Sequence, residues 1–270
     1  STQIRRTMAI VNGLLGNWDQ PGGLLAARQV GLSGPELPDS PFYEDNPDDR
    51  ADHGRAHMMF DEEGSFKHMR DAIIEQKPYP VKGWFAYKIN PLQSVANRTK
   101  TLQMIDNLDF ILTVDIAMSD TAWMSDLVLP APSYLERQDP ASGLQGSSAC
   151  ACVVTRDPVV PALFESKPVF WIFKELAKRL DLGEHFDFTI EDFRKAQLEK
   201  LPEVVLALKN DGVYNHVGHS HGIHEGKPFK TRSKKIELFN SRYEENGIDP
   251  MPGYTPPQPI SEDELRIVVG

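Results

Sequence analysis

The chain has 270 residues and a formal net charge of −10 at pH 7, from 29 Lys and Arg against 39 Asp and Glu. This acidic total excludes a general nucleic-acid binder, which would present a basic face. A hydrophobic fraction of 40% with 9% aromatic residues is typical of a globular chain rather than a disordered one. The two cysteines, Cys150 and Cys152, are too few for a disulfide framework or a structural zinc site.

Both ends of the sequence interrupt a pattern. Residues 4–10 begin in the middle of a helical repeat, and residues 265–270 stop as a strand begins. No stretch reaches the roughly 18 consecutive apolar residues that a membrane-spanning helix needs, and no signal-peptide pattern precedes the first helix. We therefore expect this chain to be a slice of a longer protein.

Residues 1–77 are predicted to combine helices with a long loop. Apolar residues recur at helical spacing over residues 4–15, and Gly16-Asn17 follows as a stop signal. Residues 31–65 are rich in Pro, Asp, Gly and His, with little periodicity, and predict a long surface excursion. A short helix is expected over residues 66–76.

Residues 78–182 carry the strongest pattern, an alternation of apolar strands and helices. Strands are predicted at residues 83–89, 110–115 and 126–130, with helices at 94–105 and 119–124 between them. Near-continuous apolar strands in this order indicate a buried parallel sheet with helical crossovers. The predicted fold class is α/β, a Rossmann-like parallel sheet with flanking helices and long irregular excursions. An amphipathic helix is predicted over residues 168–180.

Residues 183–270 are predicted to form a helical and loop region. A helix is expected from Thr189 to Lys200, capped by Thr189 with Asp192 three residues on. A loop rich in Gly, His and Lys follows over residues 211–235, then a short strand at 235–239 and a linker at 250–259.

Polar residues at the predicted strand ends form the first candidate site. Lys88 and Asn90 close the first strand, Asp115 closes the second, and Asp126 precedes the third. Ligands of open parallel sheets bind at the carboxyl ends of strands, where an acid can accept hydrogen bonds from a ribose or a purine edge. The turn from Asn90 to Ser94 opens a helix whose free amides suit a phosphate.

A plainer interpretation of the same residues stays open. Asn90 and Ser94 can be helix caps, and Asp115 can be a solvated strand end. The glycine-rich fingerprints of nicotinamide and P-loop proteins are absent from the sequence.

Three other groups of residues are candidates for chemical sites. His216, His219, His221 and His224 could bind a transition metal, but their Gly-rich surroundings favour a loop, and no metal site is predicted. The Cys150-Ala151-Cys152 pair is expected to be reduced and structural, because no Lys, Arg or His within the segment lowers a thiol pKa. Ser133 lacks the GxSxG surroundings of a hydrolase nucleophile. No catalytic residue is assigned.

Several ordered motifs resemble a known family. They are Leu14 to Gly23, Ile89-Asn90-Pro91, Leu108 to Ala122, Ser125 to Ala131, Tyr134-Leu135-Glu136-Arg137 and Lys230 to Leu238. Together they resemble the molybdopterin oxidoreductases of the dimethyl-sulfoxide-reductase type. Arg232 and Lys234 depart from the family pattern, which usually has Thr-Pro-Ser-Gly-Lys-Ile-Glu in this segment. Among branches, the chain is most similar to catalytic subunits of polysulfide and thiosulfate reductases.

The resemblance implies a cofactor and its contacts. Such enzymes hold one molybdenum between two molybdopterin guanine dinucleotides, each carried by a Rossmann-like region, and residues 78–182 resemble one carrier. Asn90 and Ser94 would then contact the dinucleotide beside Lys88, and Asp115 would lie at the guanine or ribose. Thr121 and Asp126 would complete the pocket.

The resemblance also implies what lies outside the chain. The iron–sulfur cluster and the molybdenum ligand are expected upstream, and a further domain is expected after Gly270, so the fragment alone should be inactive. The intact enzyme would reduce a sulfur compound such as polysulfide or thiosulfate. Its partners would be an iron–sulfur electron-transfer subunit and a possible membrane anchor, in the periplasm.

Two rival functions stay open at this point. One is a stand-alone nucleotide-binding or scaffold domain without catalysis. The other is a formate-type or arsenate-type member of the same family.

Overall fold

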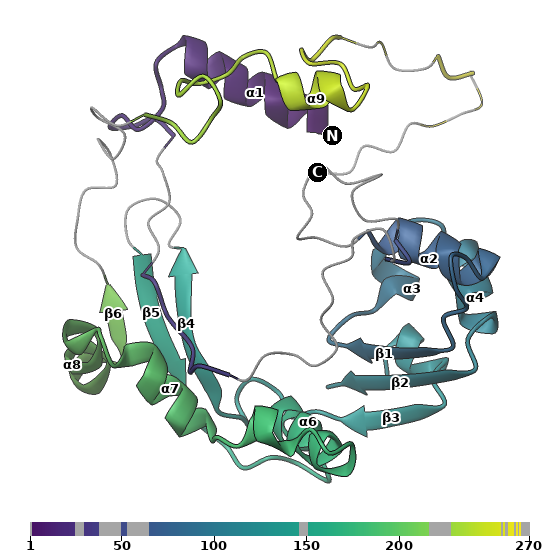
Figure 1. Cartoon of the computed structure of the whole chain (residues 1–270), viewed down its shortest axis with the longest axis vertical. Coiled ribbons are helices and arrows are strands. Elements are labelled where there is room, and N and C mark those ends of the chain that lie inside the picture. Colours follow the sequence, from purple (N-terminus) through teal and green to yellow (C-terminus); the bar gives the residue numbers. More distant parts are fainter. Residues whose placement is uncertain are drawn as a thin grey trace. The chain divides into compact units, whose positions relative to one another are not determined.

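A computed structural model describes residues 2–24, 30–37, 50–52, 65–145, 151–215 and 228–254, together with residues 256, 259–261, 263 and 265. The chain divides into two compact units, one formed by residues 1–27 with 218–270 and the other by residues 28–217 (Figure 1). The division into three segments at residues 77 and 182 stays a prediction.

The larger unit contains the predicted parallel sheet. Its strands are β1 (Gly83–Tyr87), β2 (Phe110–Asp115) and β3 (Leu127–Pro130), and they pair in the order β1-β2-β3, all parallel. The α/β fold class is confirmed. The first strand is shorter than predicted, because Lys88 adopts a left-handed conformation with a φ of 58° and turns the backbone away.

Helices cover both faces of the parallel sheet (Figure 1). Successive side chains of β2 point to opposite faces, so Ile111 packs on one side while Leu112 and Val114 pack on the other. Apolar burial of this kind stabilises by about 1.5–3 kcal/mol for each large side chain. Ile111 belongs to a core cluster with residues of α2 (Phe66–Glu75), α3 (Pro91–Ser94) and α4 (Arg98–Asp106). Leu112 and Val114 belong to a second cluster with residues of α6 (Val169–Arg179).

The first crossover is two short helices rather than one. The prediction of a single helix over residues 94–105 is wrong, because α3 ends at Ser94 and α4 begins at Arg98. Asn97 separates them with a φ of 66°, and its side-chain oxygen accepts a hydrogen bond from the Lys100 amide at 3.1 Å. Asparagine tolerates the left-handed conformation, and its side chain also caps a helix, so Asn97 both ends the turn after α3 and begins α4. The second crossover contains α5 (Asp120–Trp123), capped by Ser119.

A second sheet was not predicted from the sequence. It consists of β4 (Asp139–Gln145), β5 (Ala151–Arg156) and β6 (Val213–Asn215), paired antiparallel in that order. Its core joins Ala141 and Val153 to Val204 of α8 (Pro202–Asp211), with α7 (Ile190–Leu198) alongside. The Thr189–Asp192 cap predicted before α7 is present as a full capping box. The sequence of β4 lacks the alternation of apolar and polar residues that predicts a strand.

The smaller unit pairs the predicted first helix, α1 (Thr2–Leu14), with the C-terminal region and its short helix α9 (Ser241–Glu245). The Arg6 guanidinium donates hydrogen bonds to the carbonyls of Asp249 and Pro250, at 3.0 and 2.6 Å, and lies over the Tyr243 ring. The strand predicted at residues 235–239 is wrong, since this segment is irregular, with turns that bond locally. The backbone N–H and C=O groups of a strand need hydrogen-bond partners on a neighbouring strand. The sequence pattern of one segment does not show whether such a neighbour is present.

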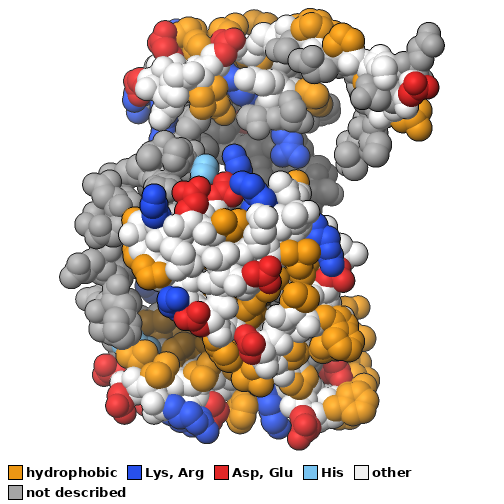
Figure 2. All heavy atoms as spheres, turned by 90° about the vertical axis from the view of Figure 1, so that its right-hand side faces the viewer, with side chains coloured by type: hydrophobic (Ala, Val, Ile, Leu, Met, Phe, Trp, Pro, Cys, Tyr) orange, Lys and Arg blue, Asp and Glu red, His pale blue; other side chains and the backbone are white. Residues whose placement is uncertain are grey.

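Large apolar side chains are exposed on the larger unit. Trp123 is 72% exposed and Ile116 is 64% exposed, and Figure 2 shows hydrophobic side chains gathered on one face of the molecule. Among the described helices, none is both long enough and apolar enough to cross a membrane.

Candidate cofactor site

A cavity of about 470 Å³ lies at the carboxyl ends of β1 and β2. This is the edge of a parallel sheet at which ligands bind. Its lining combines polar, aromatic and charged side chains from the two strand ends and from the chain after β3. These residues are Tyr87, Lys88, Ile89, Asn90, Val114, Asp115, Ile116, Ala131, Tyr134, Arg137 and Arg156.

Asp115 is the last residue of β2, and its carboxylate is held in place from two sides. One oxygen accepts a hydrogen bond from the Ile116 amide at 2.7 Å, and the other accepts one from the Ser119 hydroxyl at 2.9 Å. Each carboxylate oxygen can accept a second hydrogen bond. Asp115 is therefore oriented by the protein and keeps acceptor capacity for a ligand in the cavity.

Asn90 is oriented by Thr121, which does not line the cavity itself. The Asn90 side-chain oxygen accepts hydrogen bonds from the Thr121 hydroxyl at 2.8 Å and from its amide at 3.2 Å. Thr121 is only 1% exposed. Although Asn90 stands at the N-cap position of α3, its side chain makes no capping bond. The Asn90 side chain thus links the segment after β1 to α5, an arrangement that the helix-cap interpretation did not include.

Ser94 and Asp126 are not brought to the cavity. The Ser94 hydroxyl is exposed and donates to the Asn90 carbonyl at 2.9 Å. Asp126 lies at the opposite edge of the sheet, where its carboxylate accepts a hydrogen bond from the Ile111 amide at 2.7 Å. Asp126 stands before β3, and parallel strands place their amino ends together, so it cannot join Asp115 at the carboxyl edge.

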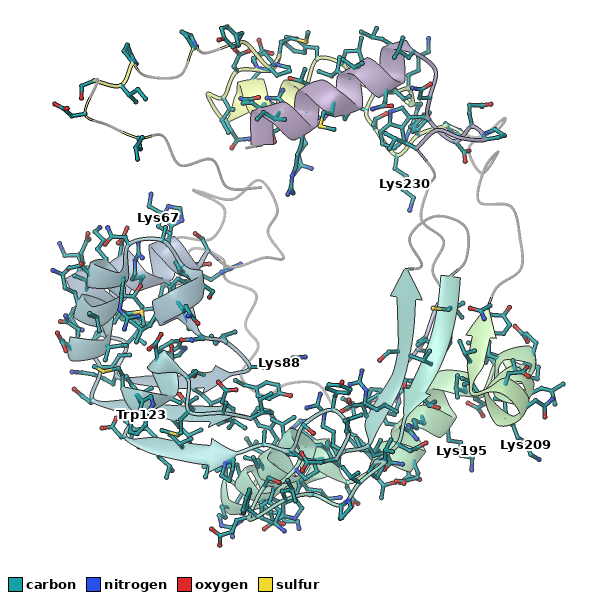
Figure 3. The ribbon with its side chains drawn as sticks, turned by 180° about the vertical axis from the view of Figure 1, so that it is seen from behind. Lys67, Lys88, Trp123, Lys195, Lys209 and Lys230 are labelled. Atoms are coloured by element: carbon teal, nitrogen blue, oxygen red, sulfur yellow. The ribbon has the colours of Figure 1, made fainter. Side chains whose placement is uncertain are left out.

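Lys88 supplies a positive charge beside the cavity. Its amide donates to the Val114 carbonyl at 3.3 Å, which continues the pairing of β1 with β2 past the last strand residue. Its exposed side chain points away from the sheet beyond the end of β1 (Figure 3). In this position the ammonium can reach an anionic ligand at the mouth of the cavity.

Among the lining residues that were not predicted as site residues, Tyr134, Arg137 and Arg156 carry polar or charged groups. Tyr134 and Arg137 belong to the Tyr134–Arg137 motif, which contributed to the family resemblance but was not assigned a role in the site. The intervening Glu136 fixes this segment by accepting hydrogen bonds from the amides of Ser133 and Leu163, at 2.7 and 2.9 Å. Bonds from the Ser133 side chain, then from its amide and that of Leu163, hold the pKa of Glu136 below its usual value. The motif thus has a physical role in placing Arg137.

The other candidate groups are not among the described residues that line the cavity. The four histidines and Cys150 lie outside the described residues, and Cys152 is half-buried in β5. Within the described ranges, no cluster of three or more His, Cys, Asp or Glu side chains could hold a metal ion. That the histidine loop holds no metal ion stays a prediction, because the loop lies outside the described residues.

The donor set of the cavity suits a nucleotide. A fixed carboxylate and an amide lie at the strand ends, and Lys88, Arg137 and Arg156 supply three positive charges around the same space. Carboxylates accept from the N–H groups of a purine or the hydroxyls of a ribose, whereas guanidinium and ammonium groups bind phosphate. The volume falls in the usual range for ligand pockets, about 300–1,000 Å³.

Comparison with known proteins gives consistent matches. A family model described as molybdopterin oxidoreductase matches residues 1–179. The thiosulfate reductase molybdopterin-containing subunit PhsA of Salmonella typhimurium is 28% identical over 241 residues, which cover 74% of this chain and 30% of that protein. Acetylene hydratase of Syntrophotalea acetylenica is 32% identical over 203 residues, covering 72% of this chain and 27% of that protein.

A solved structure is similar in fold as well. Acetylene hydratase from Pelobacter acetylenicus matches with a TM-score of 0.59 and 30% identity, covering 71% of this chain and 26% of that one. The chain therefore spans less than a third of the length of these relatives. Because the family model covers well over half of the 270 residues, this chain belongs to the molybdopterin oxidoreductase family.

Proposed function

We propose that this chain is one nucleotide-carrying part of a molybdenum-dependent oxidoreductase catalytic subunit, and that it binds one molybdopterin guanine dinucleotide. The observation that carries the proposal is the cavity at the carboxyl ends of β1 and β2, with Asp115 fixed at one strand end and cations around it. Family membership supports the pterin, and the donor set supports the nucleotide.

Different residues would bind different parts of the nucleotide. The Asp115 carboxylate would accept hydrogen bonds from the ring N–H and exocyclic amine of guanine, a pair of donors that adenine does not present on one edge. Asn90, oriented by Thr121, would bond the nucleotide beside it. When bound, the cofactor supplies two-electron chemistry at molybdenum, and the protein contributes binding, orientation and electrostatics.

We further propose that the intact enzyme reduces a sulfur compound such as thiosulfate or polysulfide. The similarity to a thiosulfate reductase subunit supports this substrate class. The similarity to acetylene hydratase makes acetylene hydration the second candidate. Assays of the intact subunit with thiosulfate, polysulfide, formate, arsenate and acetylene separate these activities, and turnover of acetylene alone would contradict the sulfur assignment.

The rest of the assembly is also part of the proposal. The chain would work inside a longer subunit with an upstream iron–sulfur cluster, an electron-transfer partner and a periplasmic location. Exposed apolar side chains such as Trp123, at 72%, support burial against further protein. The short span relative to the known relatives supports the longer subunit.

An Asp115→Asn variant of the full-length subunit tests the cofactor assignment. The variant keeps the shape of the side chain but replaces an acceptor oxygen by a donor group. Loss of one charge-assisted hydrogen bond, worth about 1.5–3 kcal/mol, should speed release of guanine nucleotide roughly tenfold or more. Retained cofactor is measured as guanine nucleotide and pterin per protein after prolonged dialysis.

Asp109→Asn is the matched control, because it makes the same chemical change beside the amino end of β2. Asp109 is exposed and forms only a surface ion pair with Lys82 at 3.3 Å. Cofactor retention should stay at the wild-type level in this variant. Equal retention in the Asp115 and Asp109 variants would overturn the assignment of Asp115 to the nucleotide.

A further inference from the structure

Two arginines of the cavity share one carboxylate. Arg137 donates through Nε to both oxygens of Asp139, at 2.9 and 3.2 Å, and Arg156 donates through Nη1 to the same group at 2.6 Å. Both arginines line the cavity at the strand ends, whereas Asp139 does not. Asp139 therefore lies behind the pair and fixes the two guanidinium groups side by side.

The backbone around this group is pinned as well. Asp139 begins β4 and pairs directly with Arg156, which ends β5. Arg194 of α7 donates to the Asp139 carbonyl at 2.7 Å and to the Arg156 carbonyl, and it forms an ion pair with Asp157 at 2.6 Å. The Arg137 guanidinium also donates to the Pro132 carbonyl at 3.2 Å. The positions of both arginines are thus set by contacts from three separate segments.

The pair keeps most of its hydrogen-bonding capacity free. A guanidinium has five N–H donors. The described protein groups accept only Nε and one Nη1 hydrogen bond from Arg137, and one Nη1 hydrogen bond from Arg156. One carboxylate cannot neutralise two guanidinium groups, so a positive charge remains beside Lys88 in a chain whose net charge is −10. Paired guanidinium groups with free donors are the usual protein partners of phosphate oxygens.

We propose that Asp139 is a positioning residue that holds Arg137 and Arg156 in place to bind the phosphates of the nucleotide. We call the two guanidinium groups the anion seat. The nucleotide then lies in one orientation in the cavity, with its base at Asp115 and its phosphates at the arginine pair. This inference rests on the proposed nucleotide site and adds the direction in which the nucleotide lies.

The test compares guanosine with guanosine diphosphate as probes of the full chain in its cofactor-free form, by isothermal titration calorimetry. Wild type should bind the diphosphate about tenfold or more tightly than guanosine. Arg156→Gln, on a side chain that is 44% exposed, should remove most of this difference and leave guanosine affinity unchanged. Arg137→Gln should do the same, with circular dichroism confirming that each variant folds.

Asp139→Asn separates positioning from simple charge. If Asp139 only offsets charge, its removal makes the cavity more positive and tightens diphosphate binding. If it positions the pair, diphosphate affinity falls several-fold while guanosine affinity is unchanged. Asp109→Asn is the matched control, because it removes the same charge from an exposed ion pair with Lys82 beside the amino end of β2, away from the arginine pair, and it should leave both affinities unchanged.

The outcomes distinguish the two proposals. Tighter diphosphate binding by Asp139→Asn, or equal losses in the Asp139 and Asp109 variants, overturns the positioning role. Guanosine binding that depends on Asp115, with no preference for the diphosphate, overturns the anion seat alone. Failure of wild type to bind either compound overturns both the seat and the nucleotide site.

Discussion

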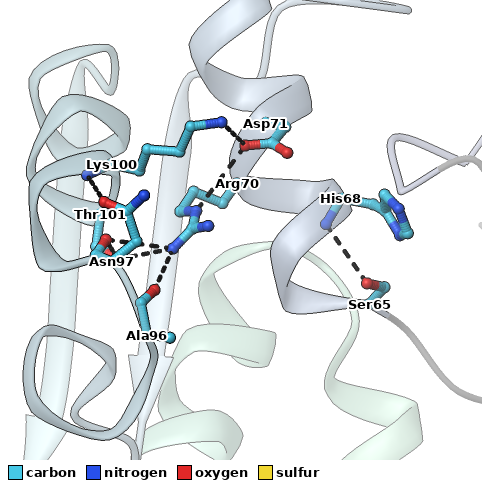
Figure 4. Close-up of polar contacts among 8 residues, drawn as sticks. All are labelled: Ser65, His68, Arg70, Asp71, Ala96, Asn97, Lys100 and Thr101. Atoms are coloured by element: carbon cyan, nitrogen blue, oxygen red, sulfur yellow. Dashed lines mark hydrogen bonds and ion pairs between the residues drawn. The ribbon is translucent and has the colours of Figure 1, made fainter. Parts of the chain in front are cut away.

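Replacement of Arg70 by leucine should destabilise the larger unit. Arg70 is only 4% exposed on α2, and its guanidinium reaches the turn between α3 and α4 (Figure 4). There Nη1 donates to the Ala96 carbonyl at 2.8 Å and, at longer range, to the Asn97 carbonyl and the Thr101 hydroxyl, both at 3.4 Å. This contact anchors the turn in which Asn97 adopts its left-handed conformation.

The size of the effect follows from these contacts. Loss of a hydrogen bond from a charged donor costs about 1.5–3 kcal/mol, and because Ala96 is exposed, water can bond its carbonyl and no further penalty is added. Two gains offset part of this cost. Leucine buries apolar surface favourably. The substitution also removes Nε of Arg70, a buried donor that lies 4.0 Å from the Asp71 carboxylate and has no hydrogen-bond partner among the described residues. We expect a net loss of about 1–2 kcal/mol in the free energy of unfolding.

Urea denaturation followed by circular dichroism measures this loss. Lys100→Met is the control, because Lys100 binds the same neighbour, Asp71, at 3.0 Å but is 46% exposed. An exposed ion pair contributes about 0–1 kcal/mol, so this variant should unfold close to wild type. If Arg70→Leu costs no more than Lys100→Met, the buried guanidinium does not hold the α3–α4 turn and the reasoning is wrong.

Two further predictions concern the loop at the cavity and the smaller unit. Hydrogen bonds from Ser133 lower the pKa of Glu136 in the folded chain below 4.5, so its stabilisation is present above that pH and is lost as the pH falls through the lowered value. Glu136→Gln should therefore reduce the difference between urea midpoints measured near neutral pH and in acid, and an unchanged difference would contradict this role. A Cβ atom on Gly23 would lie 2.1 Å from the Asn17 carbonyl oxygen, which accepts the Leu24 amide. Gly23→Ala should break this turn at a cost of about 1–3 kcal/mol and speed hydrogen exchange at Leu24. Exchange at the wild-type rate would show that the turn adapts.

The sequence predicted the parallel sheet because its signals are local. Residues 110–115 are a nearly continuous apolar run that ends in an acid, and such a run is buried on both faces and ends at the ligand-binding edge of a parallel sheet. The position of Asp115 at the cavity followed from that pattern, as did those of Lys88 and Asn90. The roles of these residues toward a cofactor stay predictions.

Other features depend on pairing between distant segments, which periodicity does not encode. Asp126 was expected beside Asp115, yet its place before β3 puts it at the other edge of the sheet, on the Ile111 amide. Thr121 was expected to contact the ligand, but tertiary packing buries it behind Asn90.

The arginine pair shows this division most clearly. Composition, charge and strand pattern determined an acidic α/β chain with a ligand edge, and they placed Asp115 at that edge. Only the tertiary structure brought Arg137 and Arg156 together, because the antiparallel register of β4 and β5 sets Asp139 opposite Arg156. Register is fixed by hydrogen bonds between strands and by side-chain packing across the sheet, so a cationic site within an acidic chain emerges only when the chain folds.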